Sequence, residues 1–212
     1  MSGQTFQERV TRQLGSLKRG PFGSEGLGSG ALRLFPVTAD FLEDSGNVAM
    51  LADWRQNNLV GFPRHQKITV EGTVAWGRAQ LIERPDRILM MIRENDSPLV
   101  GHVGLSNFDF AAGSCEFDNV IRGDKQARKG VMGDACRVLI DWAYGTLGVS
   151  RLWLRTFLDN LPAITLYYRS GFRVRSIAPL IRVESPGQVE FLPAPSTQRI
   201  DRFDIVMEHE RG

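Results

Sequence analysis

The chain has 212 residues, of which 42% are hydrophobic and 24% are charged, so it can bury one substantial core. Its 26 basic and 24 acidic side chains give a net charge of +2, which argues against the strong positive field of a general nucleic-acid-binding protein. No apolar run approaches the roughly 20 residues that a membrane-spanning helix needs, and the first thirty residues lack a signal-peptide pattern. We therefore expect a cytoplasmic protein that binds neither nucleic acid nor membrane.

Several common types of site are also disfavoured by the motifs that the chain lacks. Cys115 and Cys136 have no CxxC spacing, so we expect free thiols and no metal. His65, His102 and His209 are scattered along the chain, and each is interpreted as a surface or core histidine. Neither a GxxxxGK[ST] loop nor a GxSxG elbow occurs, which excludes a P-loop and an α/β-hydrolase nucleophile.

Residues 1–30 differ in composition from the rest of the chain. Apolar residues near its start recur at the spacing of a short amphipathic helix: Phe6, Val10, Leu14 and Leu17. The next stretch, RGPFGSEGLGSG, contains five glycines and one proline, a composition typical of a flexible linker. We interpret residues 1–30 as a loosely docked extension, with a partner-binding helix as the alternative, and residues 31–212 as the main domain.

Helix and strand patterns alternate from Ala31 onward. Residues 31–37 predict a strand, residues 45–54 a helix that Asn47 would cap, and residues 69–82 a second helix that Thr69 would cap. Three adjacent strands then follow as a meander: residues 87–93, 99–108 and 115–122.

The second half of the chain alternates helices with strands. Apolar residues on one helical face predict a helix that begins near Gly133: Ala135, Val138, Leu139, Trp142 and Ala143. An apolar strand follows at residues 150–157, then a short helix with Asp159 or Asn160 as its cap and Gly171 beyond its end. Two further strands are predicted at residues 172–177 and 202–210. This order predicts an α+β fold, with a mixed sheet flanked by helices.

The stretch QARKGVMGDA, residues 126–135, joins a predicted strand to a predicted helix. Backbone N–H groups and the positive end of the helix dipole therefore converge there, which favours an anion such as phosphate. Gly130 and Gly133 allow close approach of the backbone, and Lys125, Arg128 and Lys129 add positive charge. Taken alone, the stretch is equally consistent with a solvated basic turn.

The segment from Cys115 to Phe172 resembles the acyl-CoA-binding half of the GNAT superfamily of N-acetyltransferases. The family pattern [Q/R]xxGx[G/A] corresponds to ARKGVM, with departures at Ala127 and Met132. The family pattern NxxAxxLYxxxGF corresponds to NLPAITLYYRSGF, in which every defined position agrees: Asn160, Ala163, Leu166, Tyr167, Gly171 and Phe172. A weaker resemblance extends over most of residues 31–208, and the branch that contains amino-sugar and ribosomal-protein N-acetyltransferases is the most similar.

The resemblance implies a GNAT fold, with a mixed, mostly antiparallel sheet in which two central strands splay apart. Acetyl-CoA or a related acyl-CoA would lie in this gap as the co-substrate, with its pantetheine arm paired to the backbone of Val120, Ile121 and Arg122. The pyrophosphate would contact the backbone of the loop: Arg128, Lys129, Gly130, Val131, Met132 and Gly133. Asn160 would contact the pantetheine arm, cap its helix, or do both.

The resemblance also implies direct acyl transfer to an amine. Tyr167 would donate a proton to the CoA thiolate, and its alternative is a purely structural role as a core tyrosine. Glu116 would be the general base, directly or through water. Strand alternation places Glu116, Asp118 and Val120 on one face, so Asp118 could instead be the base or orient the acceptor, and ordered water alone is a third mechanism.

We therefore expect an N-acyltransferase that acts on the primary amine of a small molecule, with a nucleotide-linked amino sugar as the favoured acceptor. Acetylation of a protein N-terminus or of a polyamine is the first alternative, and a non-catalytic acyl-CoA-binding module is the second. The sequence does not decide whether the protein is a monomer or a homodimer. The proline-rich residues 178–199 are interpreted as a surface connection, with a role in the acceptor pocket or a dimer contact as alternatives.

Overall fold

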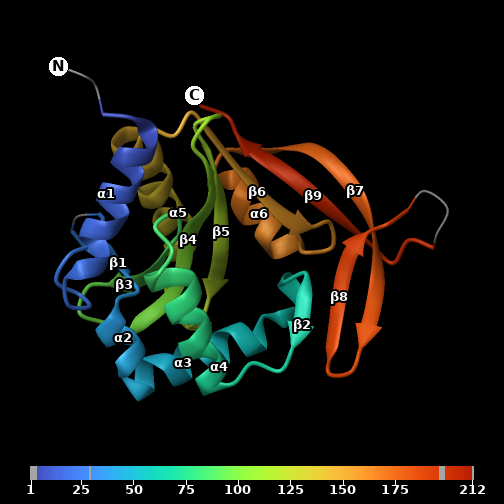
Figure 1. The fold of residues 1–212 in the computed structure, drawn as a ribbon, viewed down its shortest axis with the longest axis horizontal. Helices are drawn as coiled ribbons and strands as arrows, with labels where there is room; N and C mark the ends of the chain where they lie inside the picture. Colours follow the sequence, from blue (N-terminus) through green and yellow to red (C-terminus); the bar gives the residue numbers. More distant parts are fainter. Residues whose placement is uncertain (1–3, 29, 196–198, 212) are drawn as a thin grey trace.

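The computed structural model describes residues 4–28, 30–195 and 199–211 (Figure 1). Parts of the N-terminal and proline-rich segments, residues 1–3, 29 and 196–198, lie outside the described residues, as does residue 212. The helices are α1 (Phe6–Arg19), α2 (Ala39–Glu43), α3 (Ser45–Asn57), α4 (Val70–Gly77), α5 (Val131–Trp142) and α6 (Leu161–Arg169), with short helical turns at Leu59–Gly61, Arg78–Ile82 and Ala143–Leu147. None of the helices in this part of the chain is long and apolar enough to cross a bilayer.

The described strands form one sheet in the order β1-β3-β4-β5-β6-β9-β7-β8-β2. The strands are β1 (Leu32–Pro36), β2 (Arg64–Gln66), β3 (Ile88–Glu94), β4 (Leu99–Asp109), β5 (Ser114–Arg122), β6 (Arg151–Phe157), β7 (Phe172–Ser185), β8 (Gln188–Pro193) and β9 (Arg202–His209). All neighbours are antiparallel except β5 and β6, which are parallel. The predicted α+β class, with a mixed and mostly antiparallel sheet, is therefore confirmed.

The helix starts show which capping predictions are correct. Thr69 caps α4 as predicted, because its hydroxyl accepts the N–H of Gly72 at 3.0 Å. The prediction for α3 is wrong: Asp44, not Asn47, is the cap, and its carboxylate accepts the N–H of Asn47 at 2.8 Å. Asp and Asn are comparable caps, and the end of α2 at Glu43 leaves Asp44 as the residue that starts the next helix.

The N-terminal helix α1 is packed into the main core. Val10 and Leu14 are fully buried, in the same cluster as residues of α5 and the central strands. Farther along, Leu27 and Leu34 exchange two backbone hydrogen bonds, at 2.8 and 2.9 Å. The expectation of a loosely docked helix is therefore wrong, because the apolar face of α1 completes the core of the domain. The division into an extension with a flexible linker and a main domain stays a prediction.

Truncation of Leu14 to alanine should lower the free energy of unfolding by about 2–5 kcal/mol, since it leaves a cavity in the main core. Arg12→Ala, an exposed change on the same helix, should stay within about 0.5 kcal/mol of wild type. Urea denaturation of the full chain would measure both values. Equal stability of Leu14→Ala and wild type would contradict the packing of α1.

The central strands β5 and β6 pair over only three positions, Ser114–Glu116 with Arg151–Trp153. Beyond Glu116 they diverge, so the remaining edge of β5 that faces β6 is unpaired (Figure 1). The predicted central splay is confirmed. One hydrophobic cluster includes residues of α1 and α5, and a second lies beneath α2 and α3, so both faces of the sheet are supported around the gap.

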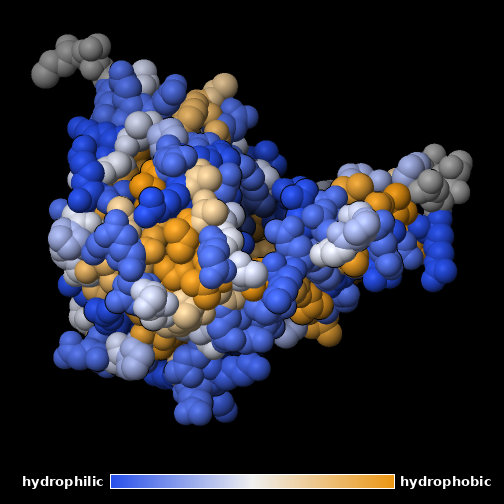
Figure 2. All heavy atoms as spheres, turned by 60° about the horizontal axis from the view of Figure 1, so that its bottom comes forward, coloured by the Kyte–Doolittle hydropathy of each residue, from blue (hydrophilic) through white to orange (hydrophobic). Residues whose placement is uncertain are grey.

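The proline-rich segment forms more structure than a surface connection. Strand β7 continues beyond the predicted end at Ile177 and turns through Pro186 and Gly187 into β8. Gly187 has a φ of 76°, the left-handed conformation that suits glycine in such a turn. This hairpin projects from the body of the molecule (Figures 1 and 2). It carries or adjoins several exposed apolar side chains: Ile177, Val183, Leu192 and Phe203.

Candidate active site

A cavity of about 830 Å³ lies at the splay, and a hollow separates the body from the projecting hairpin in Figure 2. One part of its lining comes from β5, α5 and α6, where the acyl-CoA contacts are predicted. The other part comes from residues 58–63 and from β7, β8 and β9. The proline-rich segment therefore contributes to the cavity wall through residues of both hairpin strands: Ala178, Leu180, Phe191 and Pro193.

A β-bulge shapes β5 just beyond the two predicted carboxylates. Asn119 and Val120 together lie opposite the single residue Val103 of β4, and Asn119 has a φ of 52°. His102 donates from Nδ1 to the carbonyl of Asn119 at 2.6 Å, so its other ring nitrogen carries no proton. Burial lowers the pKa of His102 to about 4. This neutral histidine supports the bulge, which places successive residues of β5 along the cavity.

The predicted phosphate loop leads directly into α5. The helix begins at Val131, earlier than predicted, because Gly130 adopts a left-handed φ of 93° and occupies the N-cap position. No side chain caps this end, so backbone N–H groups of the first turn remain available for an anion. Gly133 has open space around its Cα, since the nearest atom to an added Cβ would be 4.0 Å away on Leu166.

Two arginines of this loop are already engaged. Arg122 donates to the carbonyls of Asp124 and Lys125, at 3.1 and 3.0 Å, and also to that of Ala127. Arg128 donates to Glu94 at 2.6 Å and to Asp134 at 2.7 Å. These contacts fix the loop. They leave the exposed Lys125 and Lys129 as its free cations among the described residues, and the phosphate role of its backbone stays a prediction.

Addition of CoA should protect Lys125–Asp134 from amide hydrogen exchange, because a bound pyrophosphate holds the loop and the first turn of α5 closed. At about 100 times Kd, the slowing can reach about 100-fold if exchange needs a ligand-free opening. Exchange of the full chain with and without CoA, followed by mass spectrometry, would measure it, with α3 as the internal reference. Unchanged exchange in this loop at saturating CoA would remove the phosphate assignment.

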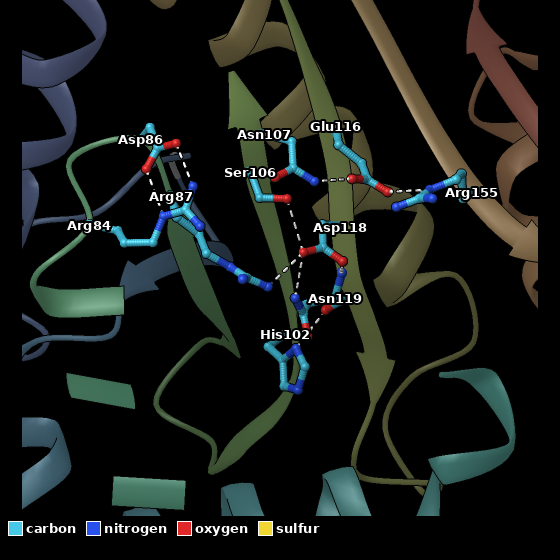
Figure 3. Close-up of polar contacts among 10 residues, drawn as sticks. All are labelled: Arg84, Asp86, Arg87, His102, Ser106, Asn107, Glu116, Asp118, Asn119 and Arg155. Carbon is cyan, nitrogen blue, oxygen red and sulfur yellow. Dashed lines mark hydrogen bonds and ion pairs between the residues drawn. The ribbon is translucent and has the colours of Figure 1, made fainter. Parts of the chain in front are cut away.

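Glu116 and Asp118 both line the cavity, as do their neighbours Phe117 and Asn119. Figure 3 shows the polar contacts of the two carboxylates. Glu116 is 7% exposed and accepts a hydrogen bond from Asn107 Nδ2 at 2.6 Å. Its other oxygen lies 3.5 Å from Nε of Arg155. Burial, together with the negative charge of Asp118, raises the pKa of Glu116. A buried carboxylate with a raised pKa is a suitable general base.

Asp118 is more fully bonded than Glu116 (Figure 3). It accepts hydrogen bonds from Arg87 at 2.8 Å and from Ser106 at 3.0 Å. The backbone and side-chain N–H groups of Asn119 donate at 2.6 and 2.7 Å. Since four donors occupy its lone pairs, Asp118 is better suited to hold the bulge and Arg87 than to accept a proton. This difference supports Glu116 as the base.

Tyr167 lies on α6 and lines the same cavity. It is 6% exposed, and its ring packs edge-on against Phe172 with centroids 6.0 Å apart. Burial raises the pKa of Tyr167, and the negative charges of Asp118 and Glu116 add to this effect. The phenol therefore keeps its proton at neutral pH. Tyr167 is therefore packed in the core, as a structural role requires, and also lies at the cavity wall, as the role of proton donor requires.

Asn160 occupies the N-cap position of α6 but makes no side-chain capping bond. Its amide donates to the hydroxyl of Thr156 at 3.4 Å, and the residue lines the cavity. The structure thus contradicts the prediction that the Asn160 side chain caps α6. The backbone at Asn160, with φ of −83° and ψ of 64°, is not in the extended conformation of a typical N-cap residue. Contact of this amide with a pantetheine arm stays a prediction.

Sequence reasoning missed several cavity residues: Arg87, Asn107, Arg155 and Asp204. Arg155 could have been noticed as a charged residue in the middle of a mostly apolar strand, on the edge of the splay. Asp204 carried no comparable signal, because its relation to the site depends on the pairing of β9 with β6 and β7. The described residues contain no group of three or more His, Cys, Asp or Glu side chains suited to a metal ion.

The open edge of β5, the uncapped start of α5 and the large cavity between them fit an acyl-CoA. An extended arm can pair with a strand edge, and phosphate suits a helix N-terminus. Fold and site together define an acyl-CoA-dependent N-acyltransferase. The family model "Acetyltransferase (GNAT) domain" matches residues 32–173, which is more than half of the chain, so the protein belongs to the GNAT acetyltransferase family.

Solved structures with similar folds include other acetyltransferases. A probable GNAT-family acetyltransferase from Chromobacterium violaceum is 18% identical with a TM-score of 0.62, covering 88% of this chain and 90% of that chain. Spermidine N-acetyltransferase from Vibrio cholerae, in complex with CoA and spermine, is 16% identical with a TM-score of 0.62, covering 84% and 94%. The microcin C7 self-immunity acetyltransferase MccE, in complex with acetyl-CoA and AMP, is 15% identical with a TM-score of 0.61, covering 85% and 92%. No curated protein matched the sequence.

Proposed function

We propose that the protein transfers an acetyl group from acetyl-CoA to the primary amine of a small molecule that has an apolar body and one positive charge. The observation that carries this proposal is the lining of the cavity beyond the predicted acyl-CoA contacts. Three phenylalanines, Phe62, Phe157 and Phe191, contribute to its walls. Such walls favour an apolar acceptor body.

Charge in the same part of the lining favours a single ammonium group. The carboxylates of Glu116, Asp118 and Asp204 face the guanidinium groups of Arg87 and Arg155. Arg122 also lines the cavity, but its guanidinium donates to carbonyls of the predicted phosphate loop. Without it, three negative and two positive groups leave one negative charge when all are ionised. A buried cavity favours a ligand that neutralises it, and an alkylammonium with one charge does so.

Two other acceptors are supported less well. A nucleotide-linked amino sugar, favoured from the sequence, would bring phosphate charge beside a lining that is already negative. A polyamine is the second candidate, supported by the carboxylate excess and by the structural similarity to spermidine acetyltransferase. The paired arginines weigh against it, because they offset two of the three carboxylates. The position of Glu116 and Tyr167 in one cavity supports turnover over a non-catalytic binding module.

The proposed mechanism uses three groups of this chain. When bound, acyl-CoA supplies an activated thioester. The acceptor amine must be neutral to react, although an alkylammonium has a pKa of about 10.4, and Glu116 accepts its proton directly or through water. Backbone N–H groups near Val120 are the candidate donors to the developing oxyanion. The phenol of Tyr167 holds a proton that stabilises the leaving thiolate, by hydrogen bonding as much as by transfer.

Release of CoA thiol with a panel of amines would test the proposal. The panel should include tryptamine, hexylamine, spermidine, glucosamine and a nucleotide-linked amino sugar, and the apolar monoamines should have the highest kcat/KM. A highest value for the sugar nucleotide would overturn the acceptor assignment. Stabilisation of the fold by CoA without thiol release for any amine would favour the binding module.

A further inference from the structure

Arg155 lies between two carboxylates of the cavity. Its Nε is 3.5 Å from Glu116 on the neighbouring strand β5. On the other side, Arg155 pairs with Val206 and Phe157 pairs with Asp204, so Arg155 and Asp204 are diagonal neighbours across β6 and β9. The positive charge of Arg155 acts against the rise in the pKa of both carboxyl groups.

The polar contact of the Arg155 side chain is longer than that of Arg87, the other arginine counted with the carboxylates of the cavity. Its side chain is 55% exposed, and its only ion pair within the described residues is the long contact with Glu116. Arg87, in contrast, is 18% exposed and bonds to Asp118 at 2.8 Å. The charge of Arg87 is therefore neutralised by Asp118, whereas the charge of Arg155 has no close partner and acts on any cation that enters the cavity.

Asp204 is the carboxylate that has capacity for such a ligand. It lines the cavity and is half-buried. Among the described residues, no ion pair or side-chain hydrogen bond engages its oxygens, unlike those of Glu116 and Asp118. Burial raises the pKa of Asp204, against the smaller opposing effects of the Arg155 charge and the backbone N–H of Ile205, because a carboxylate removed from water is destabilised. A bound ammonium group would relieve this.

We propose that Asp204 binds the ammonium group of the acceptor, and that Arg155 is a specificity residue that excludes acceptors with a second positive charge. One ammonium group compensates the excess carboxylate while Arg155 stays between Glu116 and Asp204. A second ammonium group would have to displace Arg155 or lie beside it, where like charges repel. This inference rests on the proposed function and names the residues that select its acceptor.

Hexylamine and hexamethylenediamine form a matched pair for the test, since they share a body and differ by one terminal amine. Removal of the Arg155 charge in Arg155→Met should lower the KM of the diamine relative to the monoamine by about tenfold, which corresponds to about 1.4 kcal/mol. Arg155→Lys keeps the charge and should keep the wild-type preference. Asp204→Asn should raise the KM of both amines by about tenfold and change kcat by less than about threefold.

Two control variants separate this effect from a general change of charge. Arg151 lies on the same strand β6 with a similar exposure of 53%, but it pairs with Glu208 and does not line the cavity. Arg151→Met and Glu208→Gln should therefore leave the ratio of the two KM values unchanged. Affinity for CoA should equal that of wild type in all variants, which also shows that each one is folded.

Calorimetric binding of both amines to the CoA complex gives a readout that does not depend on turnover. If wild type acetylates amines but Arg155→Met keeps the wild-type ratio of the two affinities, the inference is overturned and the proposed function stands. If neither wild type nor any variant acetylates the amines, but Arg155→Met shifts the ratio of the two affinities toward the diamine, the inference stands and the proposed function fails. Unchanged affinity of both amines in Asp204→Asn would also overturn the inference.

Discussion

Replacement of Glu116 by glutamine should lower kcat/KM for amine acetylation by about 10²–10⁴-fold, the typical contribution of a general base. The change keeps the size of the side chain but removes the group that accepts the proton of the ammonium. Burial and Asp118 raise the pKa of Glu116, so wild-type activity should fall as the pH drops through that raised value. The deficit of the variant should shrink as the pH rises to about 10.4 and above, where half or more of the amine is already neutral.

A pH profile of kcat/KM for wild type, Glu116→Gln and Asp118→Asn would check this result. CoA affinity should be unchanged in Glu116→Gln, because the residue lies outside the predicted CoA contacts. Asp118→Asn should lower thermal stability, since it breaks the ion pair with Arg87. Wild-type behaviour of Glu116→Gln with loss of activity in Asp118→Asn would move the base to Asp118. Unchanged profiles in both variants would leave ordered water as the base.

Removal of the hydroxyl group in Tyr167→Phe should lower kcat by about 10²-fold, the lower end of the range for general acid–base catalysis. The ring keeps its packing against Phe172, so folding and CoA affinity should be preserved. Burial keeps the phenol protonated, and a hydrogen bond to the leaving sulfur is what the variant loses. Single-turnover measurements of thiol release would separate this step from product release.

Tyr168 provides a matched control beside it on the same helix. Its side chain is 45% exposed and does not line the cavity, so Tyr168→Phe should turn over at the wild-type rate. Full turnover of Tyr167→Phe with normal CoA affinity would leave Tyr167 with its core role alone. A fall in CoA affinity without a fall in kcat would give it a binding role instead.

The sequence predicts best what local patterns determine. The apolar face around Leu139 and the glycine at Gly171 are local signals, and the structure has the helices α5 and α6 at these places. The bulge at Asn119 was missed, because strand alternation was assumed to continue from Glu116 and Asp118 to Val120, whereas the bulge adds one residue to β5 before Val120. The juxtaposition of Arg155 and Asp204 was missed for another reason: strand register across β6 and β9 decides it.

The pairing of β2 with β8 has a consequence for the order in which the site is assembled. The predicted acyl-CoA contacts come from residues 120–160, whereas the acceptor part joins residues 58–63 to residues 178–206. The acceptor part closes a longer stretch of chain than the acyl-CoA part does, so its formation costs more conformational entropy. Contacts between residues so distant in the sequence tend to form late in folding. The strands β2 and β8 pair over only three positions, so we expect this pairing to open more readily than the longer ones in the sheet. A chain near its unfolding midpoint should therefore release the amine before it releases CoA.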